Sequence, residues 1–101
     1  TMNILNCNQL REWSAEGKNF KLIDIRELYE AELETLGGEC IPMEHLESHM
    51  SKIPTDIPVV IHCNSGKRSK AAVYHLSVKH GFSNLFTLEG GIAECPECRS
   101  C

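Results

Sequence analysis

Short apolar runs alternate with amphipathic stretches along the whole chain. The apolar runs predict strands at residues 4–5, 20–26, 39–42, 57–62 and 84–88. The amphipathic stretches predict helices near residues 7–16, 27–34, 44–50 and 67–80. Strands that alternate with helices fold into a parallel sheet with helices on both faces. The pattern therefore predicts one α/β domain with a small, mainly parallel sheet of four to five strands.

The apolar segment Ile57–His62 leads directly into a cysteine. A strand that is apolar along its length is covered on both faces. It is followed by Cys63, a polar loop and a predicted helix. The dipole of that helix, inward-facing loop amides and the cations Lys67 and Arg68 would each favour the thiolate. This stretch predicts a reactive cysteine in a loop that binds a small oxyanion or sulfur species.

Composition limits the classes of partner. The chain has 101 residues and a net charge of −4, which fits one domain and argues against nucleic-acid binding. Cations are scattered, except for Lys67, Arg68 and Lys70 directly after Cys63. No apolar run approaches the roughly 18 residues of a membrane helix, and no signal-peptide pattern opens the chain. We therefore expect a cytoplasmic protein with no membrane partner.

Cysteine usage gives a second indication of the compartment. The six cysteines are Cys7, Cys40, Cys63, Cys95, Cys98 and Cys101. An even number in a short chain is compatible with disulfides. Segments rich in Ile, Leu and Val, without a visible secretion signal, favour reduced thiols instead. Under this interpretation Cys7 and Cys40 are small apolar packing residues.

Two histidines, His45 and His49, share one face of the predicted helix 44–50. Their spacing would allow both rings to bind one metal ion. A zinc site needs at least a third protein ligand, and none lies nearby in the sequence. We therefore interpret them as two solvated histidines.

A carboxylate and a guanidinium, Asp24 and Arg26, end the predicted strand 20–26. The carboxyl edge of an open α/β sheet is where ligands bind. Asp24 could instead cap the next helix, and Arg26 could pair with Asp24 or Glu27. The residues by themselves favour this structural interpretation over a direct chemical role.

The spacing from cysteine to arginine separates two chemistries. Cysteine-dependent phosphatases and arsenate reductases place an arginine six positions after the cysteine, where this chain has Ser69. Here the arginine is Arg68, one position earlier. The shorter loop, Cys63–Arg68, resembles that of rhodanese-type sulfurtransferases.

Three further motifs support the resemblance, which extends from about Leu5 to Ile92. They are the segments 22–27, 38–42 and 88–92. The segment 38–42 lacks the histidine that the family often has, and it is most similar to rhodanese domains fused behind adenylyltransferases that activate ubiquitin-like proteins. The resemblance implies a three-layer α/β/α rhodanese-like fold.

The resemblance also implies a mechanism that needs no cofactor. Cys63 would accept sulfur from a small anionic donor such as thiosulfate and pass it, through a persulfide, to cyanide or a thiol. A sulfur-carrier protein or a cysteine desulfurase is a further candidate partner. Asp24 is expected to be structural. The residues expected to bind the donor are Asn64, Ser65, Gly66, Lys67, Arg68, Ser69 and Arg26.

The end of the chain departs from the family. A cysteine-rich tail, residues 95–101, replaces the usual tryptophan and closing helix, so we expect the rhodanese-like domain to span residues 1–94. Cys95, Cys98 and Cys101 lack a fourth ligand at motif spacing and are weak metal candidates. The alternatives are a redox dithiol that receives sulfur from Cys63, or a flexible end of a longer chain.

Two alternative functions stay open. The domain could be a noncatalytic sulfur carrier or interaction module, because folds of this kind are reused for binding. A cysteine-dependent phosphatase or arsenate reductase is disfavoured by the length of the loop.

Overall fold

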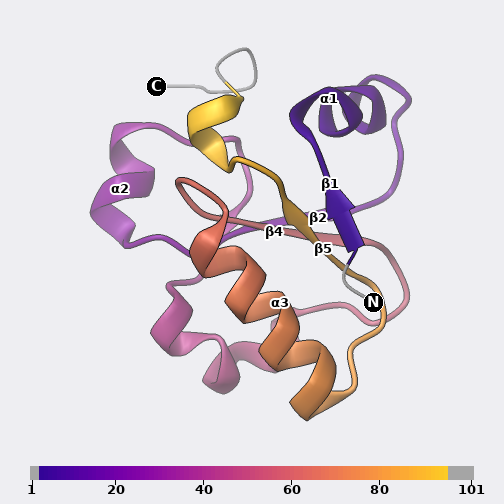
Figure 1. Cartoon of the computed structure of the whole chain (residues 1–101), viewed down its shortest axis with the longest axis vertical. Helices are drawn as coiled ribbons and strands as arrows, with labels where there is room; N and C mark the ends of the chain where they lie inside the picture. Colours follow the sequence, from indigo (N-terminus) through magenta and orange to yellow (C-terminus); the bar gives the residue numbers. More distant parts are fainter. Residues whose placement is uncertain (1–2, 96–101) are drawn as a thin grey trace.

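The computed structural model describes residues 3–95, in which helices cover both faces of a parallel sheet (Figure 1). The strands are β1 Asn3–Leu5, β2 Lys21–Asp24, β3 Glu39–Cys40, β4 Val59–His62 and β5 Leu85–Leu88. The helices are α1 Cys7–Ala15, α2 Leu28–Leu33 and α3 Lys67–His80, with 3-10 helices η1 Met43–His45, η2 Glu47–Lys52 and η3 Ile92–Glu94. The sheet order is β1-β5-β4-β2-β3, with every pair parallel. The predicted α/β/α fold is confirmed.

Alternate residues of β4 face two separate cores. Val59 and Ile61 belong to the core beneath α3, whereas Val60 belongs to the core beneath α1. All four residues of β4 are buried, as expected for a central strand with both faces covered. The strand thus holds its carboxyl end, where Cys63 follows, in a fixed position between two packed layers.

The predicted ends of two helices are confirmed. Asn6 and Gln9 form a capping box at the start of α1, so that each side chain accepts a hydrogen bond from the other residue's amide. At the other end of the domain, α3 stops at Gly81, whose φ of 74° is the left-handed geometry of a glycine C-cap.

The predicted helix 44–50 forms differently. The chain there makes η1 and η2, with a kink at His49 where φ is −118° and ψ is 20°. Neither piece has a side-chain cap, and such short uncapped segments commonly adopt 3-10 geometry. Leu46, between the two pieces, is nevertheless buried in the core beneath α3, so the segment still packs against the rest of the domain.

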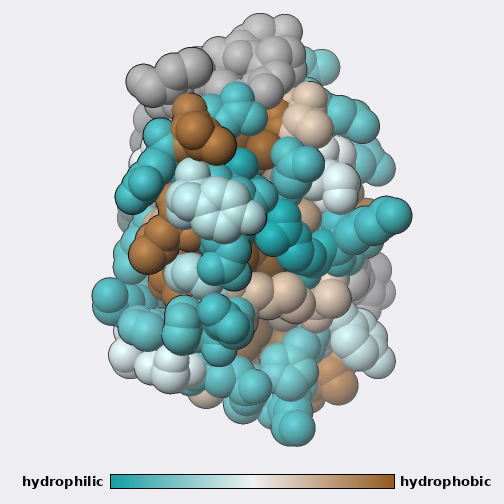
Figure 2. All heavy atoms as spheres, turned by 90° about the vertical axis from the view of Figure 1, so that its left-hand side faces the viewer, coloured by the Kyte–Doolittle hydropathy of each residue, from teal (hydrophilic) through white to brown (hydrophobic). Residues whose placement is uncertain are grey.

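Helix α2 contributes no buried residue. Its apolar side chains Leu28, Tyr29 and Leu33 are 60%, 66% and 74% exposed. Figure 2 shows the side of the molecule on which α2 lies, where hydrophobic patches are separated by hydrophilic side chains. No helix in the described part of the chain is long and apolar enough to cross a membrane.

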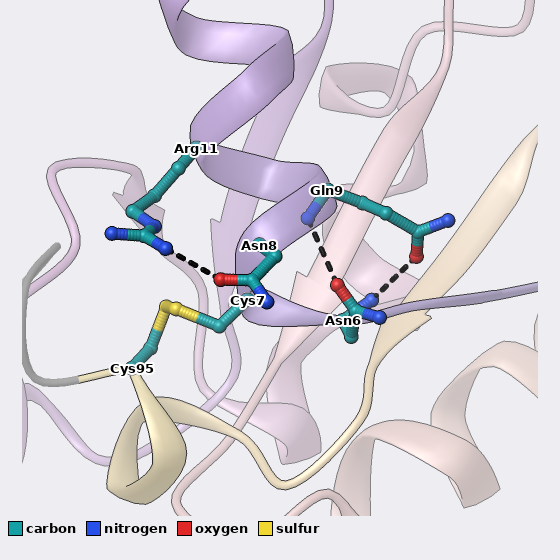
Figure 3. The surroundings of a disulfide bond; sticks show 6 residues. All are labelled: Asn6, Cys7, Asn8, Gln9, Arg11 and Cys95. Atoms are coloured by element: carbon teal, nitrogen blue, oxygen red, sulfur yellow. Dashed lines mark hydrogen bonds between the residues drawn. A yellow bond between two sulfur atoms is a disulfide. The ribbon is translucent and has the colours of Figure 1, made fainter.

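A disulfide joins the start of α1 to the end of the described chain (Figure 3). Cys7 is bonded to Cys95, which lies 88 positions further along the sequence. The expectation that Cys7 is a reduced packing residue is therefore wrong for this structure. Cys95 is fully buried in the core beneath α1, where it packs as part of the folded domain. Such a bond stabilises a fold mainly by restricting the unfolded chain.

We predict that reducing this disulfide lowers the free energy of unfolding by about 2–5 kcal/mol, because a long loop is released in the unfolded state. Urea unfolding with and without reductant measures the difference. A variant carrying Cys7→Ser and Cys95→Ser should have the same unfolding midpoint as the reduced wild type, and reductant should not change that midpoint. Equal midpoints for oxidised and reduced wild type would contradict the prediction.

Candidate functional site

Cys63 lies directly after β4, at the carboxyl edge of the sheet. The thiol is 1% exposed, while Asn64 and Ser65 on the following loop are exposed. Gly66 then ends the loop with a φ of 97° and serves as the N-cap of α3. That left-handed conformation is easily reached by glycine and strained for other residues. The loop therefore turns sharply above a thiol that lies just beneath the protein surface.

Main-chain amides of the loop point at the Cys63 sulfur. The Gly66 N–H donates to Sγ over 3.1 Å, and the Ser69 N–H donates over 3.4 Å. The Ser69 hydroxyl oxygen lies 3.7 Å from the same sulfur. Converging donors of this kind form an anion-binding cradle at the start of a helix.

Two opposing effects act on the pKa of Cys63. Burial raises it, but hydrogen bonds with the Ser69 amide and hydroxyl and with the Gly66 and Ser65 amides lower it. The net result is a pKa below the usual value for cysteine. Loop amides thus lower this pKa as predicted, together with one hydroxyl, whereas an effect of the cations Lys67 and Arg68 stays a prediction. A lowered pKa favours the thiolate, which is the nucleophilic form of cysteine.

Ser69 is itself held by a buried network. Its hydroxyl lies 3.1 Å from the Gly66 carbonyl oxygen and 2.7 Å from the Thr87 hydroxyl. Both Ser69 and Thr87 are buried, at 0% and 1% exposure. Sequence reasoning missed Thr87, and its one signal was a hydroxyl within an otherwise apolar strand. Thr87 fixes the serine that in turn contacts the sulfur.

The glycine pair at 90–91 packs closely against the loop that follows Cys63. A Cβ on Gly91 would lie 2.4 Å from the carbonyl oxygens of both Cys63 and Asn64. This close approach lets the next two amides bind those oxygens, Ile92 to Cys63 and Ala93 to Asn64, each over 3.0 Å. Because both carbonyls are hydrogen-bonded, the loop is fixed in the conformation in which its amides bind the Cys63 sulfur.

Asp24 and Arg26 form a buried ion pair beside the site. The Arg26 Nη2 lies 2.8 Å from Asp24 Oδ2 and 2.8 Å from the Glu34 carbonyl oxygen. The expected pairing is confirmed, but α2 is capped by Glu27, so the alternative of Asp24 as its cap is wrong. Arg26 is 3% exposed, and these contacts support the α2 segment. Binding of the anionic sulfur donor by Arg26 stays a prediction.

The two cations after the loop differ in their surroundings. Lys67 is exposed at the start of α3. The Arg68 side chain is 42% exposed and forms an ion pair with Glu30 of α2, with 3.5 Å between Nη1 and Oε1. Both side chains are therefore accessible to solvent at the rim of the loop.

Burial favours the neutral forms of two other titratable residues near the carboxyl edge of the sheet, Cys40 and His62. Cys40 has a raised pKa, because of burial and then the charge of Asp24, so it stays a neutral thiol. His62 is fully buried and has a lowered pKa, chiefly because burial disfavours its charged form. Its ring nitrogens have no hydrogen-bond partner among residues 3–95. These observations indicate a packing role for His62.

Of the three tail cysteines, Cys95 lies within the described residues, whereas Cys98 and Cys101 lie outside them. Cys95 is bonded to Cys7 and belongs to the core beneath α1, whereas Cys63 belongs to the core beneath α3. The disulfide therefore rules out Cys95 as a free thiol or metal ligand in this state. The predicted roles of Cys98 and Cys101 lie outside the described residues.

Comparison with known proteins identifies the class. The rhodanese-like domain family matches residues 6–96, so the chain belongs to that family. A crystal structure of a rhodanese-related protein from Thermoplasma volcanium superimposes with a TM-score of 0.82 and 28% identity, covering 94% of this chain and 91% of that one.

Two curated relatives add a functional indication. The chain is 33% identical over 92 residues to a sulfurtransferase of Allochromatium vinosum, covering 90% of this chain and 85% of that protein. It is 34% identical over 87 residues to MoeZ of Mycobacterium tuberculosis, described as a probable adenylyltransferase/sulfurtransferase, covering 83% of this chain. The match spans 22% of MoeZ. Family membership and these relatives support sulfurtransferase activity in general.

We predict that Gly91→Ala destabilises the protein more than Gly17→Ala does. Both glycines have a positive φ, 62° and 70°, but Gly91 also has a ψ of −160°, a region that essentially only glycine adopts. A Cβ on Gly91 would also lie 2.4 Å from the loop carbonyl oxygens, whereas a Cβ on Gly17 meets nothing within 4 Å. Gly17→Ala should cost about 1 kcal/mol of stability, and Gly91→Ala at least about twice that, because its backbone is more strained and the loop carbonyls must move. Urea unfolding measures both losses, and equal losses would contradict the prediction.

We predict that Ser69→Ala shifts the titration of Cys63 to higher pH. The lost hydroxyl favours the thiolate in the wild type, and its removal raises the pKa. The pH profile of Cys63 alkylation, followed on its peptide by mass spectrometry, reports the shift. Ser77→Ala, further along α3, is the control and should leave the profile unchanged. An unmoved profile in a folded Ser69→Ala variant would contradict the role of the hydroxyl.

Proposed function

We propose that the chain is a sulfurtransferase that carries sulfane sulfur on Cys63. The observation that supports this most directly is the convergence of the Gly66 and Ser69 amides on a buried Sγ whose pKa is lowered. A thiolate in this position is a nucleophile, and the donors around it suit a sulfur-centred anion.

The proposed reaction has two balanced steps. The Cys63 thiolate attacks the outer sulfur of thiosulfate, an S–S bond forms to Cys63, and the bond to the sulfite sulfur breaks as sulfite leaves with the electron pair. A cyanide ion or a thiolate then attacks the outer sulfur of the persulfide, and the Cys63 thiolate leaves. Neither step needs a cofactor, since each transfers one sulfur between nucleophiles.

The loop has distinct tasks in these steps. In our proposal, the amides of Gly66 and Ser69 favour the thiolate when it attacks and when it leaves. Lys67 and Arg68, at the solvent-accessible rim, attract the anionic donor. Because Arg68 is already paired with Glu30, binding of the donor would compete with that ion pair.

The loop composition also bears on the phosphatase alternative. The position six after the cysteine is Ser69, whose buried hydroxyl contacts Sγ and Thr87. No guanidinium therefore occupies the position from which phosphatases contact a tetrahedral oxyanion.

A protein partner and a cytoplasmic location stay predictions. The Cys7–Cys95 bond argues against a reducing compartment, because disulfides are uncommon there.

We predict that thiosulfate treatment adds the mass of one sulfur atom to the Cys63 peptide, and that Cys63→Ser abolishes both this product and thiocyanate formation. Cys40→Ser is the matched control, since Cys40 is a neutral thiol near the same edge of the sheet. It should keep the activity within about twofold, as expected for a residue outside the reaction.

The result distinguishes the remaining functions. A persulfide that forms but is not passed to cyanide or to a thiol would favour a sulfur carrier. Hydrolysis of an aryl phosphate that depends on Cys63 would favour a phosphatase. If folded wild type gave no persulfide with thiosulfate or with a cysteine desulfurase, the proposal would be overturned.

A further inference from the structure

A second group of potential ligands lies away from Cys63, where η2 meets the carboxyl-terminal half of α3. Glu47 comes from η2, and His75 and His80 come from α3. Glu47 Oε1 lies 3.4 Å from His75 Nε2, and Glu47 Oε2 lies 3.0 Å from His80 Nε2. The ligand atoms of the three side chains all lie within 4.8 Å of one another.

We propose that Glu47, His75 and His80 bind a divalent transition-metal ion of the zinc type. Two imidazoles and a carboxylate are a donor set that zinc uses, with bonds of about 2.0–2.2 Å and neighbouring ligand atoms about 3.3 Å apart in tetrahedral geometry. Each histidine Nε2 already lies close to that distance from one of the two Glu47 carboxylate oxygens. Solvent would complete the coordination, since the site lies at the surface.

The three side chains are able to close around an ion. The side chains of Glu47, His75 and His80 are 60%, 43% and 25% exposed, so small rotations need no repacking of the core. Acid would weaken binding, because each histidine must be neutral to act as a ligand.

The packing suggests what the ion does. η2 contributes no buried residue, and in Figure 1 it lies beside α3. An ion shared by Glu47 and the two histidines would join these elements. It would stabilise the folded state alone, because the three ligands come together only after folding. This inference is independent of the chemistry at Cys63.

The chain contains its own control pair. His45 and His49 are also near neighbours, with ring centroids 6.3 Å apart. Within residues 3–95, the one group of three or more potential ligands is Glu47, His75 and His80. The pair at 45 and 49 therefore has two of the needed ligands and no third, so its removal tests whether the histidine content of the surface explains binding.

Calorimetric titration with Zn²⁺ tests the proposal. The full chain with Cys98→Ser and Cys101→Ser is the parent, so that those two thiols do not compete for zinc. We expect Glu47→Gln, His75→Ala and His80→Ala each to raise Kd at least tenfold, with circular dichroism confirming the fold. The double variant His45→Ala/His49→Ala should keep the parent's Kd within about twofold.

A thermal readout separates this site from other zinc-binding groups. Zn²⁺ at a concentration that saturates the parent should raise the Tm of the parent and of the double variant by several degrees, and should raise the Tm of His80→Ala clearly less. The proposal would be overturned by an absence of zinc binding to the parent. It would equally be overturned by a Kd that none of the three substitutions changes, or that the double variant alone weakens.

Discussion

The active loop depends on two main-chain hydrogen bonds that come from the end of the domain. The amides of Ile92 and Ala93 bind the carbonyl oxygens of Cys63 and Asn64, and the missing side chain of Gly91 makes that contact possible. A loop whose amides all point inward must direct carbonyls elsewhere, and buried carbonyls need partners. The glycine pair and η3 supply these partners, so the geometry at the sulfur is set by residues distant in the sequence.

The site balances burial against hydrogen bonding. Partial burial and the charge of Asp24 raise the pKa of Cys40, whereas the pKa of the more deeply buried Cys63 is lowered because donors surround its sulfur. The decisive difference is the direction of nearby dipoles, since both cysteines lie near the same edge of the sheet. Fixed amides stabilise the anion without reorganising at the moment of reaction. This arrangement favours the thiolate form without placing a cation on the sulfur.

Local patterns were enough to predict the sheet, the three α-helices and the position of the loop after Cys63, because apolar runs, caps and turn glycines act over a few residues. Contacts between segments that are distant in the sequence could not be predicted from these local patterns. Nothing local marks Cys7 as the partner of Cys95, and nothing local brings Glu47 to the histidines of α3. Thr87 was likewise predicted as a strand residue, but its hydroxyl acquires a role when β5 lies beside the loop. The burial of Arg26 depends in the same way on the packing of α2.

The bond between Cys7 and Cys95 has a topological consequence. With its covalent backbone, it turns nearly all of the described chain into a closed ring. A protease that cut one exposed loop, such as the one at Gly37, would open the ring but leave both fragments covalently attached. Two cuts would be needed to release a fragment. The reactive loop therefore sits in a molecule that a single nick cannot take apart while the disulfide persists.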